Sequence, residues 1–112
     1  MLPIRICNIL LDDNLTSTLF ILLKTPYEYR DLDAIKMLKG DGAGVILFED
    51  ATLFSVYNKR RLDLLKVVDE IFVINDDLEA RGFKGKAGEG TQVVDYSQAI
   101  DLMMKYDQTI TL

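Results

Sequence analysis

Few side chains in this sequence can carry out chemistry, and one of them is a thiol. Cys7 is the only cysteine among the 112 residues, and the chain has no histidine. Without an imidazole, Ser–His and Cys–His nucleophile pairs are excluded, as are most catalytic zinc sites. Arg5 lies two residues from Cys7 in a β-type segment, so both would share a face, and a neighbouring cation lowers a thiol pKa. Cys7 is therefore a candidate nucleophilic or sulfur-carrying residue; the alternative is a small core residue.

Three carboxylates form a second candidate site. Asp12 and Asp13 end the stretch "ILLDDN", and Asp50 follows "VILFE". This pattern resembles the way in which receiver domains hold Mg²⁺ and accept a phosphoryl group. However, no helix separates the first two expected strands, and no lysine follows the last well-marked strand. A degenerate receiver-type signalling domain is therefore one alternative, and the simpler interpretation is that these carboxylates end strands and cap helices.

Two glycine-rich stretches do not match nucleotide-binding loops. Gly40–Gly44 precedes an expected strand, whereas a dinucleotide loop follows a strand and opens a helix. Gly85–Gly88 lacks the Gly-Lys-Ser/Thr ending of a phosphate loop. We interpret the first as a helix-to-strand turn and the second as a surface loop. The sequence therefore predicts no cofactor, and its single cysteine and lack of histidine predict no metal site.

The charge of the chain argues against a nucleic-acid binder. The formal net charge is −5, and the sequence pI is about 4.6. A free-standing nucleic-acid-binding domain is normally basic. The one basic cluster consists of Lys59, Arg60 and Arg61, with Lys66 further on, and we interpret it as the solvated face of a helix. We therefore expect no direct contact with nucleic acid.

Length and composition predict one domain over residues 1–112. No segment approaches the roughly 18–20 apolar residues of a membrane span, and the start of the chain lacks the pattern of a signal peptide. A single cysteine cannot form an internal disulfide and fits a reducing compartment. We therefore expect a cytoplasmic protein without membrane contact.

Short apolar runs alternate with helical patterns along the chain. Thr25-Pro26-Tyr27-Glu28 reads as a capping box that opens a helix ending at Gly40. Further helices are expected after Asp50, Asp76 and Asp95, with Gly82 ending the one after Asp76. The expected strands are Thr18–Leu23, Gly44–Phe48, Glu70–Ile74, Gln92–Val94 and Thr109–Leu112, preceded by an extra strand at Ile4–Leu10.

This alternation predicts an α/β fold: a Rossmann-like three-layer domain whose mostly parallel sheet of about five strands is flanked by helices. Residues 1–17 are expected to form an N-terminal extension with an extra strand. An apolar stripe in the middle of the chain is open to two interpretations, the core or a partner interface. It consists of Leu53, Phe54, Val56 and Tyr57.

Four colinear segments resemble the DsrH/TusB-like family of the DsrE/DsrF/DsrH superfamily. Thr18–Glu28 is similar to that family's opening strand followed by Lys-Ser/Thr-Pro-Phe/Tyr-Glu, and Val45–Ala51 to its strand ending in Asp-Gly/Ala. Phe72–Gly85 resembles its Asn-Glu-Asp-x-x-Ala-Arg-Gly-Leu-x-Gly segment, and Val93–Leu112 its Asp-Tyr tail. Cys7 precedes the matched region. The first-helix cysteine of some members is absent from Ala34-Ile35-Lys36, and Leu112 replaces their terminal tryptophan.

The resemblance implies a sulfur-relay function. Such proteins assemble with DsrE/TusD-like and DsrF/TusC-like subunits, have a small TusA-like sulfur carrier as a further partner, and relay persulfide sulfur for tRNA wobble 2-thiouridine formation or for sulfur oxidation. The established sulfur-carrying cysteine lies on the DsrE/TusD-like partner, so this chain is expected to be a non-catalytic subunit, with a homo-oligomer as a further possibility. A Cys7-dependent carrier of sulfane sulfur stays an alternative. The expected partner or relay surface consists of Lys24, Thr25, Pro26, Asp50, Arg81 and Tyr96.

Overall fold

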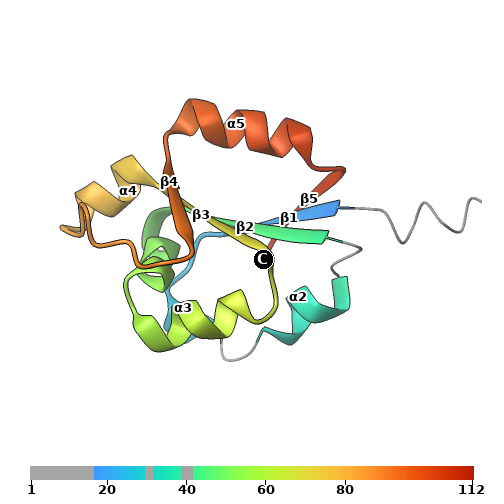
Figure 1. Ribbon diagram of the computed structural model, residues 1–112, viewed down its shortest axis with the longest axis horizontal. Helices are drawn as coiled ribbons and strands as arrows, with labels where there is room; N and C mark the ends of the chain where they lie inside the picture. The colour runs from blue at the N-terminus through green and yellow to red at the C-terminus, as the bar shows by residue number, and fades with distance from the viewer. Residues whose placement is uncertain (1–16, 30–31, 39–41) are drawn as a thin grey trace, which may run out of the picture.

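The computed structural model describes residues 17–29, 32–38 and 42–112, and its centre is a five-stranded sheet (Figure 1). The strand order is β4-β3-β2-β1-β5, and every neighbouring pair runs parallel. The expected α/β fold with a parallel sheet is therefore confirmed. The strands are β1 (Ser17–Leu22), β2 (Gly42–Leu47), β3 (Glu70–Ile74), β4 (Thr91–Val94) and β5 (Gln108–Thr111).

The first strand begins at Ser17, so the last residue of the expected extension 1–17 belongs to the sheet. The extra strand expected at Ile4–Leu10 lies outside the described residues, as do Cys7, Asp12 and Asp13.

Helices cover both faces of the sheet. The connections from β1 to β4 contain α2 (Asp33–Leu38), the 3₁₀ helix η2 (Glu49–Ser55), α3 (Asn58–Leu65) and α4 (Asn75–Ala80). The last crossover, α5 (Tyr96–Lys105), returns the chain from β4 to β5 at the opposite edge. Figure 1 shows α5 on one side of the sheet and α2 with α3 on the other.

The apolar strand residues divide between two cores because successive side chains of a strand point to opposite faces. In β1, Phe20 and Leu22 belong to the larger core, beneath α2, η2 and α3, whereas Leu19 belongs to the smaller core beneath α5. Burial on both faces explains why these strands are continuous apolar runs without alternation. The apolar stripe of η2 is mainly core: Phe54 is fully buried, and Val56 packs against the same cluster.

The helix expected from Pro26 to Gly40 is wrong in its first half. Only a 3₁₀ turn, η1 (Pro26–Glu28), forms there, and the Thr25 side chain makes no capping hydrogen bond. The helical backbone ends at Tyr29, whose carbonyl and hydroxyl both make hydrogen bonds to residues distant in the sequence. Its carbonyl accepts Nη2 of Arg60 at 2.5 Å, and its hydroxyl donates to the carbonyl of Leu112 at 3.1 Å. The chain then starts a separate helix, α2.

Two other helix starts also differ from expectation. Phe48 precedes η2 and Ile74 precedes α4, and neither helix has a side-chain cap. Asp50 and Asp76 therefore lie within first turns, where an acidic side chain still favours the positive end of the helix dipole.

The capping box at α5 is confirmed. The Asp95 side chain accepts the backbone N–H of Gln98 at 2.7 Å, and the Gln98 side chain accepts the backbone N–H of Asp95 at 2.9 Å. Gly82 also ends α4 as expected, at a φ of 81°. The N–H groups of Gly82 and Phe83 donate to the carbonyls of Glu79 and Leu78, which is the Schellman arrangement.

The close approach of α5 to the sheet depends on Gly44. A Cβ at this position would lie 2.8 Å from Cζ of Tyr106, whose hydroxyl donates to Oε2 of Glu70 at 2.6 Å. At Gly42 the nearest atom to such a Cβ is 3.7 Å away.

We therefore expect Gly44→Ala to lower the free energy of unfolding by about 1–3 kcal/mol, as overpacking usually does. Gly42→Ala is the matched control on the same strand and should change it by less than about 0.5 kcal/mol. Urea denaturation measures both variants. Equal effects would contradict a requirement for glycine at position 44.

Candidate functional site

The candidate residues meet at the carboxyl edge of the sheet. Because all five strands are parallel, the residue that follows each strand emerges at the same edge. Asp50 follows β2, Arg81 ends the helix after β3, and Tyr96 begins the helix after β4. Open α/β sheets bind their ligands at this edge, at the point where the connections that follow two adjacent strands go to opposite faces of the sheet. Here that point lies between β3 and β4, since Leu78 of α4 packs in the larger core and Ala99 of α5 in the smaller.

Asp77 links three strand ends at this edge. One of its oxygens accepts the backbone N–H of Glu49 at 2.7 Å, and the other accepts the hydroxyl of Tyr96. Asp77 is therefore the residue on which the contacts among β2, β3 and β4 converge. It was not among the residues expected from the sequence. The available signal was the second aspartate of the "NDD" motif (Asn75–Asp77), but the local pattern favoured a helix cap there.

Asp50 and Arg81 form an ion pair next to Asp77. Nε of Arg81 donates to Oδ1 of Asp50 at 2.9 Å, and Nη1 donates to the carbonyl of Asp77 at 3.2 Å. The Asp50 side chain is 58% exposed, so the pair adds little stability and mainly fixes the orientation of both groups. We call Glu49, Asp50, Asp77, Arg81 and Tyr96 the carboxyl-edge network.

Glu49 adopts a strained backbone conformation. Its φ is 49°, in the left-handed region, and no other described non-glycine residue has a positive φ. Such a conformation costs on the order of 1–3 kcal/mol and persists only where its surroundings enforce it. The hydrogen bond from Glu49 N–H to Asp77 supplies one such restraint. Strain of this kind gathers at functional sites, which supports this edge as the functional one.

Tyr96 stays protonated in this environment. The hydrogen bond to Asp77, reinforced by burial and the Asp77 charge, raises the pKa of Tyr96 from 10.0 to about 12. Its ring stacks on Phe48 with centroids 6.3 Å apart. The network therefore presents a neutral phenol, an ion pair and an aromatic face. These groups are suited to recognising a protein surface.

Lys24, Thr25 and Pro26 follow β1 at the same edge. Lys24 is exposed and Pro26 is buried, and η1 packs against η2, with Tyr27 and Tyr57 rings 6.2 Å apart. These three residues therefore border η2, which also contains Asp50. The structure thus places all six expected surface residues on one edge, but only Asp50, Arg81 and Tyr96 share a hydrogen-bonded network.

An exposed apolar stripe on α5 adjoins the network. Tyr96, Ile100 and Met104 are spaced four residues apart and are 44%, 57% and 81% exposed. The opposite side of the helix packs on the smaller core through Ala99, Leu102 and Met103. Apolar residues therefore occupy more than one face of α5, and only one of these faces is covered by the described residues. We call these three residues the α5 stripe.

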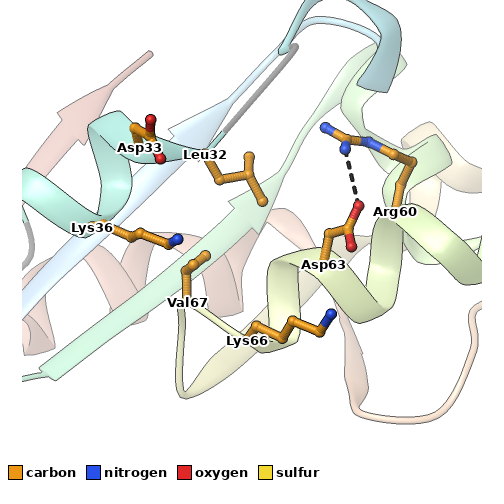
Figure 2. Close-up of a pocket in the computed structure, with 7 residues that line it drawn as sticks. All are labelled: Leu32, Asp33, Lys36, Arg60, Asp63, Lys66 and Val67. Carbon is orange, nitrogen blue, oxygen red and sulfur yellow. Dashed lines mark hydrogen bonds and ion pairs between the residues drawn. The ribbon is translucent and has the colours of Figure 1, made fainter.

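The basic cluster on α3 is not a uniformly solvated face. Lys59 and Lys66 are exposed as expected, whereas Arg61 is buried. Arg60 donates to Asp63 at 3.1 Å and lies over the ring of Phe54, 5.5 Å from its centroid. A groove of about 310 Å³ lies between α2 and α3. Figure 2 shows the residues that line it: Leu32, Asp33 and Lys36 on the α2 side, and Arg60, Asp63, Lys66 and Val67 on the α3 side.

Within the described residues, no helix combines the length and apolar composition that crossing a bilayer requires.

Comparison with known proteins identifies relatives that cover most of the chain. The family model described as "DsrH like protein" matches residues 24–109. A protein named TusB from Yersinia enterocolitica is 28% identical over 93 residues, which cover 82% of this chain and 97% of that protein. Proteins of the same name from Enterobacter sp. strain 638 and Photorhabdus laumondii are 26% and 25% identical, over 70% and 80% of this chain and 83% and 95% of their own lengths.

The Tyr96–Asp77 hydrogen bond predicts how the pKa of Tyr96 responds to a substitution of Asp77. Asp77→Asn removes the charge that stabilises the protonated phenol, so the pKa of Tyr96 should fall by about one unit or more towards its ordinary value. Because the folded-state pKa lies above 10.0, stabilisation by this bond is complete below pH 10 and is lost as the pH rises through about 12. NMR titration of the Tyr96 ring measures the shift. Asp76→Asn is the control and should produce a smaller fall, and equal falls would contradict the assignment.

Proposed function

The chain belongs to the DsrH-like family, and we propose that it acts as a non-catalytic subunit of a cytoplasmic sulfur-relay complex that passes persulfide sulfur between proteins. The observation that carries this proposal is the composition of the matched region. Residues 24–109 contain no cysteine. A protein that accepts persulfide sulfur needs a thiolate to attack the outer sulfur atom. The matched region therefore has the sequence of the family without the group that the transfer requires.

The proposed role is to assemble and position the relay. DsrE/TusD-like and DsrF/TusC-like subunits would supply the thiol chemistry, and a small TusA-like protein would deliver the sulfur. The names of the TusB relatives favour the branch that leads to tRNA wobble 2-thiouridine, with sulfur oxidation as the alternative.

The carboxyl-edge network and the α5 stripe together form the proposed partner surface. The network offers charged and hydrogen-bonding groups in fixed positions, and the stripe offers apolar side chains that gain from being covered. Tyr96 belongs to both and joins them into one surface. Lys24 and Thr25 extend this surface towards β1, whereas Pro26 is buried beneath it. An apolar centre beside a polar rim is the usual composition of a specific protein interface.

The first test is recovery of partners from a native lysate of cells that encode a DsrE-like protein. We expect the tagged chain to recover DsrE-like and DsrF-like subunits, identified by mass spectrometry. Ile100→Glu places a charge in the α5 stripe without disturbing the core, because Ile100 is exposed, and should reduce recovery about tenfold or more.

Gln98→Glu is the matched control for this variant. It adds the same charge to the same helix, and a glutamate can keep the capping box with Asp95. Recovery with Gln98→Glu should equal that of the unmodified chain. If the unmodified chain recovers no DsrE-like or carrier protein, the proposed function is wrong. If Ile100→Glu recovers partners fully, only the proposed surface is wrong.

The second test separates a positioning subunit from a sulfur carrier. Cys7→Ser should retain full relay activity in the reconstituted complex, because Cys7 lies outside the matched region. Polysulfide treatment followed by intact-mass measurement should leave the unmodified chain without a stable added sulfur. Loss of relay activity in Cys7→Ser, with a gain of one sulfur atom on the unmodified chain, would instead favour the carrier alternative.

A further inference from the structure

Arg61 is a buried charge held under a loop. It lies on α3 and is only 9% exposed. Its guanidinium lies against Gly88, in the loop between α4 and β4. Two hydrogen bonds hold this loop in place: the Gly88 N–H donates to the carbonyl of Ser55 at 2.8 Å, and Oγ1 of Thr91 donates to the carbonyl of Gly88 at 2.6 Å. The surroundings of the guanidinium are therefore ordered.

No group of the described residues pairs with this guanidinium. Within the described part of the chain, Arg61 makes no side-chain hydrogen bond and no ion pair, whereas its neighbour Arg60 bonds to both Asp63 and Tyr29. Nε of Arg61 is sealed from solvent without a partner. The two Nη atoms make no hydrogen bond to the described residues and are not among the sealed atoms, so they are the more accessible end of the group.

This arrangement is costly unless a counter-ion is present. Arginine stays charged at all accessible pH values, so it cannot escape the cost of burial by losing its proton. Burial of an unpaired charge is strongly unfavourable, and a hydrogen-bonded anion offsets much of the cost. The described residues thus supply no counter-charge to Arg61, and its Nη end is the part that is open to an anion.

We propose that Arg61 is the binding group of an oxyanion site. The Nη1–Nη2 end of a guanidinium matches the spacing of two oxygens on a carboxylate, phosphate or sulfate. Gly88 permits this placement, because a Cβ there would overlap Nη1 and Cζ of Arg61. Lys86, two residues earlier in the loop, is exposed and adds positive potential. The site shares no residue with the carboxyl-edge network and does not depend on the proposed function.

The test uses the full chain with ¹⁵N-labelled arginine. Inorganic phosphate, sulfate and acetate are each titrated at fixed ionic strength, with chloride as the reference ion. We expect the Arg61 guanidinium resonance to shift saturably, with a Kd on the order of millimolar for a single guanidinium fork. Preference for acetate would indicate a carboxylate of another protein as the natural ligand, and preference for phosphate or sulfate would indicate a free oxyanion.

Two variants assign the effect to the fork of Arg61. Arg61→Lys keeps the charge but loses the planar fork, and should weaken oxyanion binding about tenfold, as followed by the rise in Tm with phosphate. Lys59→Met, an exposed charge on the same helix, should leave the rise unchanged.

Three results would overturn the proposal. The first is a wild-type Arg61 resonance that does not respond to any of the three oxyanions. The second is a resonance that already shows a slowly exchanging, paired guanidinium before any oxyanion is added. The third is an equal loss of binding in Lys59→Met and Arg61→Lys. The first two need no variant, so they decide the question even if Arg61→Lys fails to fold.

Discussion

Parallel alignment of all five strands is the constraint on which the other features of this structure depend. Two neighbouring parallel strands must be joined by a crossover connection, because both run in the same direction. The residue that follows each strand therefore lies at the same edge of the sheet. Residues from four separate segments of the chain therefore gather at one edge. The final crossover, α5, lies on the opposite face from α2 and α3, and this reversal separates the connections that follow β3 and β4. The carboxyl-edge network occupies that point.

Asp77 shows how local and long-range interactions are combined at this edge. Its carboxylate restrains the left-handed backbone of Glu49 and keeps Tyr96 protonated. The same side chain thus couples β2, β3 and β4 and fixes the shape of this part of the surface. Such an arrangement is consistent with the proposed role of a subunit that positions partners.

Much of the fold follows from local sequence, but the limits are instructive. Features that depend on neighbours within a few residues could be predicted from the sequence. These are the apolar runs, the Asp95–Gln98 capping box and the left-handed Gly82. The helix expected from Pro26 failed because Arg60, more than thirty residues away, takes the carbonyl of Tyr29. A contact between such distant residues leaves no trace in a local pattern. Arg61 was misjudged for a related reason, because its burial depends on a loop that arrives from the far side of β3.

The sequence by itself determined the α/β class, the parallel sheet, the family and the position of the only thiol outside the matched region. These properties depend on residue types, order and periodicity, all of which can be read along one chain. Only the tertiary structure decided that Asp77 links the carboxyl edge. It also decided that the described residues leave one side of α5 uncovered and Arg61 buried without a partner among them. These properties depend on strand register and side-chain direction, which bring residues distant in the chain to within hydrogen-bonding distance.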